Sequence, residues 1–117
     1  RETTDLVHIN EPHLLLHNGF GPEVAMESPC VARYNGLYYL FWSLCDGQNG
    51  SYDNRTLVYA APTLDEMDGK APLTVLRAHA PELVVGEDGQ WYIISVFYPE
   101  NGLSMAPIRW EDSYEKV

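Results

Sequence analysis

ESPCVARYNGLYYLFWS, from Glu27 to Ser43, is the stretch of sequence that decides the fold. It contains a β-prone segment, Cys30–Tyr34, and an aromatic segment, Leu37–Ser43. Asn35-Gly36 stands between them, and this dipeptide favours a two-residue hairpin because a type I′ turn needs positive φ at both central positions. Bulky apolar residues fall on both faces of the second segment, as is typical of a strand covered on two sides. The stretch therefore predicts an antiparallel hairpin within a layered β-structure.

A similar stretch, HAPELVVGEDGQWYIIS, runs from His79 to Ser95. Glu27 and His79 are 52 residues apart (79 − 27), and so are Ser43 and Ser95 (95 − 43). Self-similarity at a period of this size is typical of repeat architectures. We therefore expect two successive copies of one β-unit, with Glu27 and His79 at the same place in each copy.

Further β-prone segments complete the two units. The expected strands are Thr56–Ala61 and Leu73–Arg77 in the first unit, and Glu82–Val85, Gln90–Phe97 and Gly102–Ile108 in the second. Four short antiparallel strands form one blade of a β-propeller. The sequence thus predicts an all-β chain with about two four-stranded antiparallel blades, a partial five-bladed propeller. Residues 22–77 and 78–117 would be the blades, and residues 1–21 the end of a preceding blade and a connector.

The charge of the chain excludes several classes of partner. Seventeen Asp and Glu residues against seven Lys and Arg give a formal net charge of −10. Nucleic acid and anionic membrane surfaces need clustered basic residues, so neither is an expected partner. No apolar run approaches the roughly 20 residues that a membrane-spanning helix needs. Neutral, hydroxyl-rich ligands such as carbohydrates remain compatible with this composition.

The two cysteines are not expected to form a disulfide. A hairpin centred on Asn35-Gly36 places Cys30 opposite position 41 and Cys45 opposite position 26. A four-residue offset along a strand is about 13 Å, beyond the roughly 7 Å that a disulfide allows between Cα atoms. We expect two free, buried thiols.

The two hairpins, each with the residues that precede it, carry a family resemblance. The motifs are Glu27-Ser28-Pro29 with Gly36-Leu37-Tyr38-Tyr39-Leu40, and Ala78-His79 with Asp88-Gly89-Gln90-Trp91-Tyr92. Over roughly residues 22–111 the chain resembles blades three and four of five-bladed β-propeller glycoside hydrolases of family 43. That family includes arabinanases, β-xylosidases and arabinofuranosidases, and the fructan-cleaving family 32 is related. Ser28 and Ala78 depart from the family, which usually has Gly at both positions.

The resemblance implies roles for two residues. Glu27 corresponds to the general acid, which protonates the leaving oxygen as the glycosidic bond breaks. His79 corresponds to the central histidine, which in many relatives binds a Ca²⁺ ion or a water on the propeller axis. His79 is also a candidate for substrate binding, and we add Glu82 and Trp42 to it. Each has a structural alternative: a solvated carboxylate for Glu27 and Glu82, a buried histidine for His79 and core packing for Trp42.

The resemblance also implies parts that this chain does not supply. An inverting hydrolase needs a second carboxylate about 6.5–9.5 Å from the acid, and the family carries that Asp base in its first blade. Asp5 is the only Asp before Glu27, and its TTDLV context does not match the base motif. A five-bladed ring needs more than about 200 residues. We therefore expect a fragment of a larger protein or a ring completed by oligomerisation, and an isolated chain without activity.

Two functions follow as hypotheses. In the first, the complete protein hydrolyses O-glycosyl bonds of a furanoside or pentose-containing polysaccharide such as arabinan, xylan or fructan, outside the cytoplasm as the resemblance implies. It predicts that Glu27 lines a pocket near His79. In the second, the chain is a non-catalytic module that binds carbohydrate or associates with copies of itself, because incomplete propellers expose strand edges and apolar faces.

Overall fold

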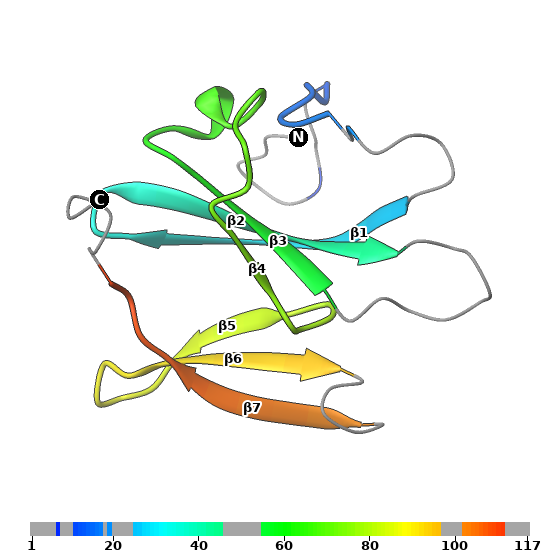
Figure 1. The fold of residues 1–117 in the computed structure, drawn as a ribbon. Helices are drawn as coiled ribbons and strands as arrows, with labels where there is room; N and C mark the ends of the chain where they lie inside the picture. Colours follow the sequence, from blue (N-terminus) through cyan, green and yellow to red (C-terminus); the bar gives the residue numbers. More distant parts are fainter. Residues whose placement is uncertain are drawn as a thin grey trace.

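The structure, a computed structural model, describes residues 7, 11–17, 19, 25–45, 55–96 and 102–111, with residue 45 described in its backbone only. Two antiparallel sheets contain all the strands of this part of the chain (Figure 1). Sheet A has the strand order β1-β2-β3-β4, and sheet B has the order β5-β6-β7. The strands are β1 (Ala25–Tyr34), β2 (Leu37–Cys45), β3 (Arg55–Ala61), β4 (Thr74–Leu76), β5 (Glu82–Val85), β6 (Trp91–Val96) and β7 (Leu103–Ile108).

The expectation of an all-β chain is confirmed. Among the described residues the only helical element is one 3-10 turn, Leu64–Glu66, between β3 and β4. The second unit has three strands where four were expected, because residues 109–111 belong to no strand. Residues 112–117, which the expected fourth strand included, lie outside the described residues.

The first hairpin forms where the sequence predicts it. Asn35 and Gly36 have φ values of 49° and 83°, and Tyr34 faces Leu37 across the turn. β2 lies between β1 and β3 in sheet A, and apolar clusters cover both of its faces. This position explains why apolar residues follow one another without alternation in its sequence.

Two apolar clusters hold the sheets, one on each face of sheet A. Between the sheets, buried residues of sheet A meet partly buried ones of sheet B and of the segment after it: Ala32, Phe41 and Val58 against Leu83, Trp91 and Trp110. On the other face, Leu40, Leu57, Tyr59, Ala61 and Met67 form a second cluster, against which Leu16 and Leu64 pack. Figure 1 shows the amino-terminal segment and the 3-10 turn on this far side of sheet A.

Two histidines tie the amino-terminal segment to the β3–β4 connection. His13 Nε2 lies 3.4 Å from Asp65 Oδ1. His17 donates its backbone N–H to Asp68 Oδ1 at 3.0 Å, and its Nδ1 lies 2.8 Å from Asp68 Oδ2. The backbone N–H of His17, and then its imidazole, hold the pKa of the Asp68 carboxyl below its ordinary value. These exposed contacts place residues 11–17 over the second cluster.

A β-bulge interrupts β1 next to Glu27. The register between β1 and β2 shifts between Glu27 and Cys30, and Ser28 has a φ of 53°. The shift moves the partner of Cys45 from the expected position 26 to Ala25. The same backbone conformation recurs one unit later, because Ala80 has a φ of 48° and is 52 residues beyond Ser28 (80 − 28).

The strand pairing corrects the alignment of the two units. Ala32 faces Tyr39 in sheet A, and Val84 faces Tyr92 in sheet B. The first strands of the units are therefore offset by 52 residues (84 − 32), but the second strands by 53 (92 − 39). Consequently Ser43 corresponds to Val96. The sequence repeat suggested Ser95 instead, and that match is wrong. The longer turn before β6 contains the additional residue.

This alignment shows that the sheets stack front to back, which means that the face of sheet A in contact with sheet B corresponds to the outer face of sheet B. Phe41 pairs with Val58 in sheet A as Ile94 pairs with Met105 in sheet B. Phe41 faces sheet B and is 4% exposed, whereas Met105 is 64% exposed. Trp91 contacts sheet A, so Ile94, an odd number of residues along the strand, faces away. The face that sheet A buries thus corresponds to the face that sheet B leaves open.

Substitutions on the two corresponding faces test this stacking. We expect Phe41→Ala to lower the free energy of unfolding by about 3–5 kcal/mol, because a buried aromatic side chain leaves a cavity. Met105→Ala should change it by less than about 0.5 kcal/mol, because an exposed side chain loses little on truncation. Urea unfolding of the 117-residue chain measures both values. Equal losses in the two variants would contradict the assigned faces.

Candidate functional site

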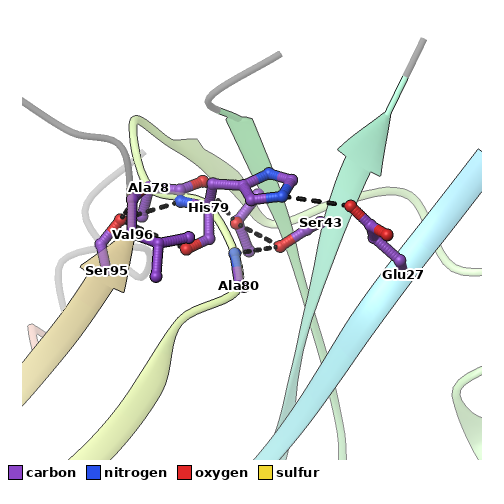
Figure 2. A network of polar contacts seen from close by, with 8 residues as sticks. Glu27, Ser43, Ala78, His79, Ala80, Ser95 and Val96 are labelled. Carbon is purple, nitrogen blue, oxygen red and sulfur yellow. Dashed lines mark hydrogen bonds and ion pairs between the residues drawn. The ribbon is translucent and has the colours of Figure 1, made fainter. Parts of the chain in front are cut away.

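The structure brings Glu27 and His79 into contact. His79 Nε2 lies 3.1 Å from Glu27 Oε1, and the two side chains come from the bulge of β1 and the segment before β5 (Figure 2). The His79 side chain is 3% exposed, whereas that of Glu27 is 41% exposed. The pair therefore has one buried member and one member that solvent or a ligand can reach.

Sheet B holds the backbone of His79. Its N–H donates to Ser95 Oγ at 2.9 Å, and its carbonyl accepts from the N–H of Val96 at 3.1 Å. Ser95 is buried and belongs to β6. Because the N–H and the carbonyl of His79 are both hydrogen-bonded to sheet B, the backbone that carries the imidazole is held in place.

Sheet A holds the residues on either side of His79. The N–H of Ala80 donates to Ser43 Oγ at 2.8 Å, and Thr56 Oγ1 donates to the carbonyl of Ala78 at 2.7 Å. Ser43 and Thr56 both have no exposed surface. No motif of the sequence indicated a role for these hydroxyls. Their only signal is a small polar residue at a buried position of an otherwise apolar strand.

The contact between Glu27 and His79 suits proton exchange. A neutral imidazole can donate its Nε2–H to a carboxylate, or it can accept a proton from a carboxylic acid at the same nitrogen. The 3.1 Å separation fits either arrangement. A carboxyl group at the edge of solvent, oriented by a buried imidazole, can thus present a proton to a bound molecule or take one from it.

The other two candidates lie away from this pair. Trp42 is next to Ser43 in β2, so it projects from the opposite face of sheet A, where it packs against the cluster that contains Leu40 and Met67. Glu82 is exposed at the start of β5, on the side of sheet B that faces away from sheet A. The structure therefore groups Glu27 with His79 and places neither Trp42 nor Glu82 beside them.

The Glu27–His79 contact by itself supplies only part of a calcium site, and that site stays a prediction. Ca²⁺ takes six to eight oxygen ligands, whereas this place offers one carboxylate and an imidazole nitrogen. In the described part of the chain, no group of three or more His, Cys, Asp or Glu side chains could hold a metal ion. Cys30 is a free thiol on the face of sheet A that meets sheet B.

A cavity of about 450 Å³ lies elsewhere, between sheet A and residues 108–111. β2, β3, the region of β4 and residues 108–111 form its walls, with Phe41, Leu76 and Trp110 among the lining side chains. Neither Glu27 nor His79 lines it. The cavity is therefore separate from the Glu27–His79 contact, and a pocket around that contact remains a prediction.

Comparison with known proteins adds no relative. No family model, no curated protein and no solved structure matches this chain. Within the described residues, no helix is long and apolar enough to cross a membrane. The interpretation of the site therefore depends on its own residues.

The backbone of the bulge next to Glu27 gives a test of local geometry. A non-glycine residue at positive φ costs roughly 1–2 kcal/mol, and glycine loses about 0.5–1 kcal/mol through the greater freedom of its unfolded chain. We therefore expect Ser28→Gly to raise the free energy of unfolding by about 0.5–1 kcal/mol. Val31→Gly, in the regular part of the same strand, should lower it. Urea unfolding measures both changes, and a loss of stability in Ser28→Gly would argue against the bulge.

Proposed function

We propose that this chain forms part of a β-propeller glycoside hydrolase in which Glu27 is the general acid. The observation that carries the proposal is the Glu27–His79 contact, in which a half-exposed carboxyl group meets a buried imidazole. Glycoside hydrolysis needs a carboxylic acid that is fixed in place and can still reach the leaving oxygen. His79 would orient the carboxyl group, and the exposed part of Glu27 would meet the substrate.

The stacking of the two sheets supports the propeller architecture. Successive propeller blades present the same front and back faces, and here the sheets stack front to back with a residue at positive φ following both Glu27 and His79. In a ring built this way, the residues at these two places recur around a common axis. Glu27 and His79 would then be neighbours at the centre of the ring, where a substrate can reach several blades.

The substrate would be a furanoside or pentose-containing polysaccharide, as the family resemblance implies. The base that activates water would come from a blade other than sheets A and B, at the separation of about 6.5–9.5 Å that inversion requires. No role in the reaction falls to a metal ion in this proposal. Its residues are Glu27, which protonates the leaving oxygen, and His79, which positions Glu27.

Substitution of the acid tests the proposal in the protein that carries this chain. We expect Glu27→Gln to lower kcat/KM on pentose polysaccharides by about 10²–10⁴-fold, because the leaving oxygen then departs without a proton. The kcat/KM of Glu27→Gln on dinitrophenyl glycosides should fall much less, because the dinitrophenolate leaving group departs without needing a proton. Glu87→Gln, in the exposed turn before β6, is the matched control. An equal loss on both substrates, or an unmodified protein that cleaves neither, would refute the role of Glu27.

A second candidate function follows from the open face of sheet B. Leu103 is 75% exposed and Met105 is 64% exposed, and Val84 lies on the same face. These positions correspond to buried ones in sheet A, and exposed apolar side chains grouped in this way are typical of an interaction surface. We infer as an alternative that the chain is a non-catalytic carbohydrate-binding or self-associating β-module that uses this face.

Light scattering at several concentrations of the 117-residue chain tests the alternative. We expect the apparent mass to rise with concentration, and Met105→Glu to abolish the rise because a charge cannot be buried there without a partner. Leu73→Glu, at an exposed position just before β4, should leave the association intact. A constant monomer mass for the unmodified chain would rule the alternative out.

A further inference from the structure

A chain of hydroxyl groups connects the two peptide groups that flank His79. Thr56 Oγ1 lies 2.7 Å from the carbonyl oxygen of Ala78 and 3.2 Å from Ser43 Oγ. Ser43 Oγ in turn lies 2.8 Å from the backbone nitrogen of Ala80. Figure 2 shows Ser43 reaching from sheet A to this segment, on the same side as Glu27.

The donors in this chain can be assigned from its ends. A carbonyl oxygen only accepts and a backbone N–H only donates. Thr56 therefore gives its single proton to Ala78, so Ser43 must donate to Thr56 and accept from Ala80. The four groups form one directed sequence, from the N–H of Ala80 through both hydroxyls to the carbonyl of Ala78. Hydrogen bonds aligned in this way strengthen one another in a buried setting.

We infer that Thr56 is a positioning residue for His79, acting through Ser43 and the backbone of Ala78 and Ala80. Sheet B fixes the backbone of His79 itself, but Glu27 belongs to sheet A. The distance between the two side chains therefore depends on the contacts that join the sheets near His79. Thr56 and Ser43 supply such contacts at the residues immediately before and after the histidine.

The side chain of Thr56 favours this role over simple packing. It has no exposed surface, and Thr56 faces Ser43 directly across the β2–β3 pair. Valine has the same branched shape, so packing alone would tolerate valine at this position. A hydroxyl is needed only because the carbonyl of Ala78 and the hydroxyl of Ser43 must be satisfied.

The inference deepens the proposed function and rests on it for its catalytic consequence. The experiment that tests it measures the Glu27–His79 contact itself, so the result does not depend on whether the protein is a hydrolase. The ¹⁵Nε2 chemical shift of His79 is measured at fixed pH with and without Glu27→Gln, in the unmodified 117-residue chain and in Thr56 variants. The change caused by Glu27→Gln reports the contact, as in a double-mutant cycle.

We expect Thr56→Val to reduce that change by about half or more, because the histidine is no longer held at its distance from Glu27. Thr56→Ser, which keeps the hydroxyl, should restore it, and Thr74→Val on the exposed strand β4 should leave it unaltered. If Thr56→Val does not fold, Ser43→Ala breaks the same chain at its middle and is expected to have the same effect. An undiminished change in the folded variant would overturn the inference.

A kinetic measurement on the same variants separates this inference from the proposed function. If the protein that carries this chain hydrolyses a pentose polysaccharide, Thr56→Val should lower kcat roughly 10-fold or more, because small displacements of catalytic groups slow the reaction. Thr56→Ser should restore the rate. A protein that hydrolyses nothing would refute the proposed function, and the NMR result would still decide the role of Thr56.

Discussion

The turn into positive φ that follows Glu27, and again follows His79, is the constraint on which the site depends. At Ser28 it inserts a bulge that shifts the register of β1, and at Ala80 it occupies the equivalent place before β5. Positive φ is unfavourable for both residues, so surrounding contacts must hold them there. For Ala80 that contact is visible, because its N–H is bonded to Ser43 of the other sheet. The local conformation and the packing of the sheets therefore maintain each other.

Much of the fold could be predicted from the sequence because its strongest determinants are local. Asn35-Gly36 defines the first hairpin through backbone sterics alone, and the β-prone segments matched the strands closely except for β1, which begins at Ala25 and not at Cys30. The bulge was not predicted, because Ser28 and Ala80 are not the glycines that such backbone usually requires. The alignment of Ser43 with Ser95 was wrong for a related reason. Counting residues cannot show into which turn an additional residue has been absorbed.

Only half of the site could be predicted from the sequence. The half that could not be predicted is formed by residues that lie far apart in the chain. The repeat placed Glu27 and His79 at the same point of successive units, so their proximity could be expected. Only its place in an otherwise apolar strand pointed to Thr56, and a threonine in a strand has ordinary β-propensity. Its partner Ala78 lies 22 residues later, and Ser43 meets Ala80 over 37 residues. Hydrogen bonds of this kind become visible only when the packing of the sheets is known.

The two outer faces of the stacked sheets differ in the described part of the chain. Leu16 and Leu64 pack on the cluster that covers the face of sheet A remote from sheet B. On the outer face of sheet B, Leu103 and Met105 are exposed. A further sheet that packed before sheet A would therefore meet side chains of residues 11–17 and of the 3-10 turn, whereas one that packed after sheet B would meet strand residues directly.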